Sequence, residues 1–171
     1  MTQKKPKILI LGVTASGKST LAFELAQNLG AEVISVDSMK VYRRMNIGTA
    51  KPPLEKQQIL KYHLIDVVEP SEAFSVDQFL DLTEKSAQDI QSRNKPVVAV
   101  GGTAMYIKAM LCGLFDGPGS DETIRARLKA EGQAEGFFEL HKRLKAVDPA
   151  AGDRIHPNDE KRIIRALEVF E

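Results

Sequence analysis

Short apolar runs and longer segments of helical periodicity alternate along the first 113 residues. The apolar runs are rich in β-branched and aliphatic side chains, which is typical of strands in a buried parallel sheet. They predict strands at residues 7–11, 32–35, 63–68 and 96–100. Asp37 lies just beyond the C-terminal end of the run at 32–35.

Apolar side chains three and four positions apart predict helices between and after these strands. The first helix spans residues 18–29 and ends at Gly30. The second begins with a capping box at Ser75 and ends at Asn94, and the third spans residues 103–111. This order of strands and helices predicts an α/β fold with parallel strands.

The pattern changes after residue 113. Glycines and a proline over residues 113–119 mark a boundary, and only helical periodicity follows, at 120–131, 134–146 and 157–171. The sequence therefore predicts an α/β core over residues 1–113 and a helical segment over 114–171.

Composition excludes several classes of protein. The chain has 171 residues, of which 43% are hydrophobic and 27% are charged, so it is globular rather than disordered. Its formal net charge of +1 gives no overall attraction to nucleic acid, so any such site depends on local charge. The single cysteine, Cys112, is expected to be buried, and no apolar run is long enough for a membrane helix. We expect a cytoplasmic monomer.

The segment GVTASGKS, at residues 12–19, matches the pattern G-x-x-x-x-G-K-[ST] between a strand and a helix. Gly12 and Gly17 let successive N–H groups point at a phosphate chain, and Lys18 adds a mobile positive charge. Ser19 offers a hydroxyl to Mg²⁺. The fold class is therefore α/β, a P-loop NTPase-like parallel sheet flanked by helices, with the helical segment attached.

The phosphate loop does not define the reaction, and the carboxylate of Asp37 leaves several open. Ligands of an open α/β sheet bind beyond the carboxyl ends of its strands, so Asp37 lies within reach of the held phosphates. It could assist a magnesium ion, hold an acceptor hydroxyl, or take a proton from a nucleophile. A structural role, such as capping the next turn, is the remaining alternative.

Six further blocks carry a resemblance to a known family. They are DSMKVYRR (37–44), IGTAKP (47–52), HLID (63–66), GGTAMY (101–106), RIHPND (154–159) and RIIRALEV (162–169). In this combination the chain resembles the tRNA dimethylallyltransferases, also called tRNA isopentenyltransferases, over essentially its whole length. Two departures are Lys40, where the family usually has glutamine, and the end of the chain at Glu171, which leads us to expect a C-terminally short form.

The resemblance implies a prenyl transfer rather than a phosphoryl transfer. The loop would hold the diphosphate of dimethylallyl diphosphate through residues Gly12, Val13, Thr14, Ala15, Ser16, Gly17, Lys18 and Ser19. N6 of the adenosine 3′ of the tRNA anticodon would attack the prenyl carbon and pyrophosphate would leave, with Mg²⁺ and Lys18 stabilising the departing charge. Asp37 matches the family's general base, and Thr103 matches the threonine beside the target base and the leaving group.

The resemblance also implies residues that contact the anticodon stem-loop of tRNA. The target base would be flipped out of its stack into a pocket lined by Asp37, Ser38, Met39 and Lys40. The last helix would meet tRNA through Lys161, Arg162, Ile163, Ile164 and Arg165, and Arg125 is a further candidate from its local context. Without the resemblance, a solvated charged face explains this helix better.

Three other functions stay open at this stage. An adenylate isopentenyltransferase would prenylate free AMP or ADP. A small-molecule kinase would share the phosphate loop and Asp37, but it gives no reason for the IGTAKP and RIHPND blocks. A truncated remnant without catalysis would bind ligands and not turn them over.

Overall fold

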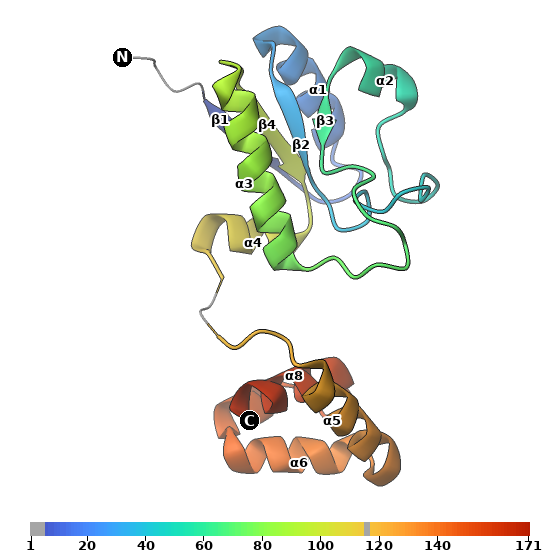
Figure 1. Ribbon diagram of the computed structural model, residues 1–171, viewed down its shortest axis with the longest axis vertical. Coiled ribbons are helices and arrows are strands. Elements are labelled where there is room, and N and C mark those ends of the chain that lie inside the picture. Colours follow the sequence, from blue (N-terminus) through green and yellow to red (C-terminus); the bar gives the residue numbers. More distant parts are fainter. Residues whose placement is uncertain (1–5, 115–116) are drawn as a thin grey trace. The chain divides into compact units, whose positions relative to one another are not determined.

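The computed structural model describes residues 6–114 and 117–171, and the chain divides into two compact units, Met1–Leu114 and Phe115–Glu171. Residues 115–116, inside the boundary expected at 113–119, lie outside the described residues. In the first unit the described elements are β1 (Lys7–Leu11), α1 (Lys18–Leu29), β2 (Glu32–Val36), α2 (Leu54–Ile59), β3 (Tyr62–His63), α3 (Val76–Ser92), β4 (Val97–Gly101) and α4 (Ala104–Cys112) (Figure 1). In the second unit they are α5 (Glu122–Glu135), α6 (Phe137–Val147), α7 (Pro149–Arg154) and α8 (Glu160–Phe170).

The first unit is built on a parallel sheet with strand order β1-β4-β2-β3. β4 lies between β1 and β2, and every residue of β2 and β4 is buried. Because all pairs are parallel, the carboxyl ends of the strands lie at one edge of the sheet. The predicted α/β parallel sheet flanked by helices is confirmed.

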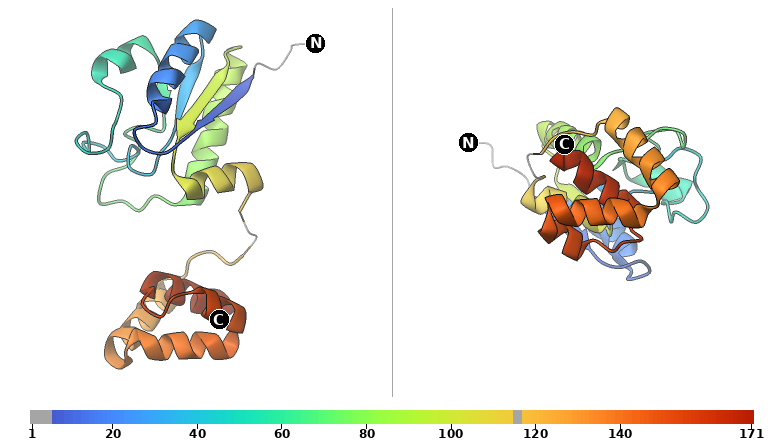
Figure 2. Two further views of the ribbon diagram at one scale, coloured as in Figure 1. Left: turned by 180° about the vertical axis from the view of Figure 1, so that it is seen from behind. Right: turned by 90° about the horizontal axis from the view of Figure 1, so that it is seen from below.

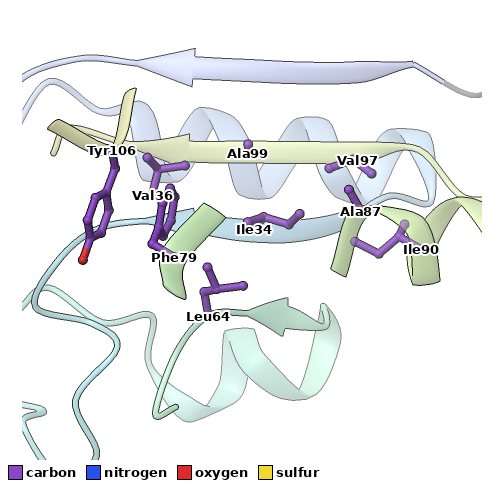
Figure 3. Packing of buried hydrophobic residues seen from close by; sticks show 9 residues of the cluster. All are labelled: Ile34, Val36, Leu64, Phe79, Ala87, Ile90, Val97, Ala99 and Tyr106. Atoms are coloured by element: carbon purple, nitrogen blue, oxygen red, sulfur yellow. The ribbon is translucent and has the colours of Figure 1, made fainter. Parts of the chain in front are cut away.

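Helices cover both faces of this sheet (Figures 1 and 2). On one face, α3 and α4 pack on β2 and β4, and the rings of Phe79 and Tyr106 stack with centroids 3.9 Å apart. Figure 3 shows this cluster, with Ile34 and Val36 on β2 and Ala99 on β4. On the other face, α1 packs through its alanines on the side chains of β2 and β4 that point the opposite way.

The predicted helix ends are correct where a local signal defines them. The Ser75 hydroxyl accepts a hydrogen bond from the Gln78 backbone N–H, and the Gln78 side chain accepts one from the Ser75 N–H, which is a complete capping box. Gly30 ends α1 with φ of 62°, a left-handed conformation that glycine adopts without strain.

The predicted third strand is wrong in length. β3 contains only Tyr62 and His63, because Leu64 and Asp66 take positive φ values of 60° and 55° that interrupt an extended strand. Residues 66–68 instead run beside the segment that follows β2, and the Val67 N–H donates to the Val41 carbonyl at 2.7 Å. Cys112, expected to be buried, is exposed.

A buried carboxylate ties together the amino-terminal edge of the sheet. Glu32, the first residue of β2, is only 3% exposed. Its oxygens accept hydrogen bonds from both terminal nitrogens of Arg93 and from Lys95 at 3.0 Å, and one lies 2.8 Å from His63 Nε2. Arg93 and Lys95 lie in the turn between α3 and β4, so this cluster joins that turn to β2 and β3.

The second unit contains four described helices around one core, where the sequence predicted three. The core comprises Leu128, Leu140, Leu144, Ala151, Ile163 and Leu167. The additional helix, α7, begins at Pro149, and the side chain of Asp148 caps it by accepting from the Ala151 N–H. No described helix in either unit is long and apolar enough to cross a membrane.

Candidate functional site

The phosphate loop occupies the turn between β1 and α1, as the motif predicted. Ala15 and Gly17 have φ values of 64° and 81°, which curl the backbone back over the start of the helix. Gly17 is the N-cap residue of α1 and has no side chain to cap the helix. The first N–H groups and the positive end of the helix dipole are therefore directed at this loop, which is the arrangement that binds phosphate groups.

Lys18 and Gly12 complete the loop. The Lys18 ammonium donates a hydrogen bond to the Val13 carbonyl oxygen at 2.8 Å, so its positive charge lies across the loop. A Cβ atom at Gly12 would lie 2.7 Å from Ser16 Oγ, so only glycine fits there without a shift of Ser16. The backbone and the charge together form a cradle for a chain of phosphates.

Asp37 lies immediately after β2 and caps the turn that follows. Its Oδ1 atom accepts hydrogen bonds from the backbone N–H groups of Met39 at 2.9 Å and Lys40 at 3.2 Å. The capping role considered from the sequence is therefore present. It uses one carboxylate oxygen, which leaves the other able to accept a proton.

Thr103 lies after β4 and is joined to the turn after β2. Its hydroxyl oxygen accepts a hydrogen bond from the Ser38 N–H at 3.0 Å and lies 3.4 Å from the Ser38 hydroxyl oxygen. The structure thus brings Thr103 beside the residue next to Asp37, although 65 positions separate Thr103 and Ser38 in the sequence. Three segments predicted to share a site therefore meet at the carboxyl edge of the sheet.

Two glycines allow this close approach, a role that the sequence reading missed. A Cβ atom at Gly101 would collide with the Val36 carbonyl, and one at Gly102 would lie 2.8 Å from the Gly12 carbonyl oxygen. The end of β4 is therefore packed directly against the turn after β2 and the phosphate loop. The Gly-Gly pair in GGTAMY was the signal that could have identified this contact.

A cleft of about 500 Å³ joins the phosphate loop to the segment after β2. It is lined by Thr14, Ala15, Ser16, Gly17, Lys18, Ser19, Thr20, Asp37, Met39, Lys40, Gly48, Thr49 and Ala50. Most of the residues predicted to bind the diphosphate, and three of those predicted to surround the base, line this one space. Thr103 does not line it and acts on it through Ser38.

Lys40 adds a second cation to the cleft. Burial lowers the pKa of the Lys40 ammonium; the charge of Asp37 opposes this shift and that of Lys18 adds to it. Met39 is 44% exposed beside it and Val41 is buried, so Met39 is available to a ligand and Val41 is a core residue.

A buried lysine holds the loop that forms the far wall of the cleft. The side chain of Lys51 is only 4% exposed, and its ammonium donates to the Tyr42 carbonyl and to Asp66 Oδ1, the latter at 2.7 Å. Residues 42–51 are thereby fastened to the segment that follows β3. Lys51 and Asp66 belong to the IGTAKP and HLID blocks, whose roles could not be assigned from the sequence.

A smaller recess of about 130 Å³ adjoins the cleft and shares Ser19, Lys40 and Ala50 with it. Its walls include Ile65 and Val100, and it is also lined by Ser35, whose buried hydroxyl oxygen has no hydrogen-bond partner in the described structure. The recess therefore combines apolar walls with hydroxyl groups and lysine side chains, among them Lys51 and Lys56.

The residues predicted to contact RNA in the second unit lie in three different settings. Arg125, Lys161, Ile164 and Arg165 line a groove between α5 and α8. The prediction for Ile163 is wrong at the level of side-chain contact, because Ile163 has no exposed surface and packs in the core of the unit. Arg162 is exposed and donates to Asp159 at the start of its own helix, at 2.9 Å.

Comparisons with known proteins identify the family of this chain. The model of the family described as "IPP transferase" matches residues 40–171. The tRNA dimethylallyltransferase of Geobacter metallireducens is 47% identical over 168 residues, which are 98% of this chain and 54% of that protein. The corresponding protein of Geobacter sulfurreducens is 48% identical over 167 residues, with the same coverage of 98% and 54%.

Solved structures give the same result. The tRNA isopentenylpyrophosphate transferase of Bacillus halodurans aligns with a TM-score of 0.63 and 42% identity, over 97% of this chain and 55% of that one. A eukaryotic dimethylallyltransferase acting on tRNA aligns with a TM-score of 0.79 and 29% identity, over 97% of this chain and 42% of that one. The chain spans about half the length of the curated relatives it matches.

The P-loop NTPase-like fold predicted from the motif is the fold of these structural neighbours. Together with the family match over residues 40–171, the shared fold shows that this chain belongs to the IPP transferase family, the tRNA isopentenyltransferases.

Proposed function

We propose that this chain transfers a dimethylallyl group from dimethylallyl diphosphate to N6 of the adenosine 3′ of the anticodon in tRNA. The observation that carries the proposal is the cleft in which the phosphate loop faces Asp37 and Lys40. A phosphate cradle beside a carboxylate suits a reaction with a diphosphate leaving group and a nucleophile that must lose a proton. The names of the relatives support this choice of substrates.

The bonds exchanged in this step are the N6–C1 bond, which forms, and the C1–O bond to the diphosphate, which breaks. Negative charge builds on the leaving pyrophosphate, where the loop N–H groups and Lys18 stabilise it. The amine proton passes to the oxygen of Asp37 that is not engaged in the turn. Thr103 supports the reaction from outside the cleft, because its hydrogen bond from the Ser38 N–H positions the turn that presents Asp37.

We propose that tRNA is the macromolecular partner and that the protein acts as a monomer in the cytoplasm. The flipped adenine would enter beside Ser38, Met39 and Lys40, because a base within a stacked loop cannot reach the cleft. In the second unit, Arg125 and the exposed residues of α8 that begin at Lys161 would contact the anticodon stem, while Ile163 supports them from the core.

We propose Mg²⁺ as the divalent metal, held beside the diphosphate by the hydroxyl of Ser19. The residues fit such an ion, because Mg²⁺ prefers oxygen ligands and is commonly shared between a protein hydroxyl or carboxylate and substrate phosphates. Ser19 lines the cleft that also contains Asp37. Bound there, the metal would neutralise charge on the departing pyrophosphate.

Replacing Ser19 by alanine is expected to raise the Mg²⁺ concentration for half-maximal transfer by about tenfold or more, the scale on which lost support of a metal site acts. Transfer rates measured across a Mg²⁺ titration test this expectation. Ser19→Thr keeps the hydroxyl and serves as the control, with a near-normal Mg²⁺ requirement. An unchanged requirement in Ser19→Ala would remove Ser19 from the metal site.

The proposed activity is tested by incubating the chain with labelled dimethylallyl diphosphate, Mg²⁺ and unmodified tRNA, with AMP and ATP as parallel acceptors. We expect label in tRNA only. Label in AMP alone would identify an adenylate isopentenyltransferase, and phosphate transfer from ATP to a small molecule would identify a kinase. Binding of the diphosphate without transfer to any acceptor would contradict catalysis by these 171 residues.

A further inference from the structure

The groove between α5 and α8 is lined mainly by basic residues. It has a volume of about 520 Å³. Its lining residues are Glu122, Arg125, Ala126, Lys129, Lys161, Ile164 and Arg165. Four of these seven residues are basic and one is acidic, so the groove attracts anions even though the whole chain is nearly neutral.

The two lysines of the groove are available to a ligand. Lys129 on α5 and Lys161 on α8 are both exposed, and neither has an ion-pair partner within the part of the chain that the structure describes. Lys129 was not predicted from the sequence, because nothing in DETIRARLK separates it from a solvated helical face. Its position opposite Lys161 becomes evident only from the packing of α5 on α8.

The two arginines of the groove, in contrast, both form ion pairs with one buried carboxylate. The side chain of Glu168 on α8 is only 2% exposed. Its Oε2 atom lies 3.0 Å from Arg125 Nε and 2.9 Å from an Arg165 terminal nitrogen. Its Oε1 atom accepts a hydrogen bond from the Asp121 N–H at 2.6 Å.

Both carboxylate oxygens of Glu168 therefore have partners inside the unit. Burial raises the pKa of its carboxyl, but the hydrogen bonds from Arg165, from the Asp121 N–H and from Arg125 outweigh burial and hold that pKa below its usual range. Its negative charge contacts guanidinium nitrogens of both arginines. The Arg125 and Arg165 side chains are 37% and 41% exposed, and both line the groove.

Arg165 also fixes the chain that leads into α5. Its guanidinium donates to the carbonyl oxygens of Pro118 and Gly119, at 2.7 and 3.0 Å. One carboxylate and one arginine thus join the start of α5 to α8, which are the two walls of the groove. The shape of the groove and the orientation of its arginines depend on the same contacts.

We propose that this groove binds the sugar-phosphate backbone of RNA, with Lys129 as a phosphate contact and Glu168 as the positioning residue for Arg125 and Arg165. The proposal rests on the proposed function and specifies how the second unit would hold tRNA. Two oriented guanidinium groups suit the forked geometry of phosphate oxygens, and two mobile lysines add charge that tolerates small shifts of the backbone. Such contacts position RNA without reading its sequence.

Glu122, which lines the groove, and Glu168, buried beside its arginines, provide a test because their loss should change RNA affinity in opposite directions. Glu168→Gln and Glu122→Gln each remove one negative charge. Glu122 is 84% exposed and pairs with Arg125 at 3.3 Å. Its loss frees that guanidinium group and removes a repulsive charge, and we expect binding of an RNA stem-loop to tighten by about two- to fivefold. Glu168→Gln removes the group that orients both arginines, and we expect binding to weaken by about tenfold.

Binding is measured on the full chain with a fluorescently labelled anticodon stem-loop RNA, without any prenyl donor, over a range of salt concentrations. If Glu168→Gln binds RNA more tightly, as Glu122→Gln should, Glu168 is only a nearby charge and the positioning role is overturned. Circular dichroism and thermal unfolding show whether Glu168→Gln is folded. If it is not, the lysine variants below decide whether the groove binds phosphate.

Lys129→Gln should reduce the slope of log affinity against log salt by about one, the effect of losing one phosphate contact. Lys142→Gln on α6 is the matched control, since Lys142 is exposed, paired with Glu139 and absent from the groove, and its slope should not change. Equal slopes in the two variants would overturn the proposal. Because no donor is present, a chain that binds RNA in this way but fails to prenylate it would contradict the proposed reaction and leave the groove intact.

Discussion

Replacing Asp37 by asparagine is expected to lower kcat for prenyl transfer by about 10²-fold or more, the usual contribution of a general base. The side-chain amide keeps an oxygen that can accept the hydrogen bonds from the Met39 and Lys40 N–H groups, so the turn after β2 stays formed. The amide cannot take the amine proton. Affinity for dimethylallyl diphosphate should change little, because in the proposed reaction the phosphates are bound by residues 14–19 of the loop and not by Asp37. Single-turnover rates test the expected loss of catalysis, and a separate measurement of dimethylallyl diphosphate binding tests the expected unchanged affinity.

Asp37→Ala is the companion variant. It removes the base and the cap together, so kcat should fall as far as in Asp37→Asn, while stability falls by about 1 kcal/mol because a cap is lost. Near-normal turnover in Asp37→Asn, with loss of activity only in Asp37→Ala, would show that Asp37 serves the turn and that another group accepts the proton.

Replacing Glu32 by glutamine is expected to lower the free energy of unfolding by about 3 kcal/mol, the lower end of the range for breaking a buried ion pair. The lower end applies because Arg93 and Lys95 are partly exposed and regain water when the carboxylate is lost. Denaturant unfolding measures the difference. Glu84→Gln is the control, since the pair of Glu84 with Lys7 is exposed on both sides and should contribute less than about 1 kcal/mol.

The same cluster gives stability a defined dependence on pH. The hydrogen bonds from Arg93, together with those from His63 and Lys95, hold the pKa of the Glu32 carboxyl well below its usual range in the folded protein, although burial acts against them. A group with a depressed folded pKa stabilises fully above its unfolded pKa, here 4.5, and that contribution is lost as the pH falls below it. Wild type should therefore lose more stability than Glu32→Gln between about pH 5 and about pH 3, a range that brackets the unfolded pKa of a glutamate. If the free energies of unfolding of wild type and Glu32→Gln fall equally with pH, Glu32 is not the source of this pH dependence.

Elements defined by nearby residues could be predicted from the sequence. The runs KILIL and PVVAV, the capping box at Ser75 and the glycine after α1 each contain their own signal, and each is found where it was expected. β3 was predicted too long because Leu64 and Asp66 turn the chain without glycine or proline. Their positive φ values follow from the pairing of residues 66–68 with a distant segment, which no local pattern contains.

In the candidate site, too, features with a local sequence signal could be predicted and features that depend on distant contacts could not. The phosphate loop is contiguous, so its residues and their roles could be predicted together. The Lys51–Asp66 pair joins positions 15 apart, and the Arg125–Glu168 pair joins positions 43 apart. Both depend on packing, and neither partner stands out from ordinary surface charge in the sequence. Ile163 shows the reverse error, since a block that resembles an RNA-contacting segment also contains a residue of the core.

The position of β4 in the sheet has a consequence for how the protein is synthesised. The segments of β1 and β2 are synthesised first, yet in the sheet they do not pair with each other, because β4 separates them. The nascent chain therefore exposes two unpaired strand edges until residues 97–101 emerge and insert between them. Long-range parallel pairing of this kind is slow and prone to aggregation. The ligand cleft of the first unit thus matures in a single late event, and a chain arrested before β4 would carry the whole phosphate motif without a sheet to support it.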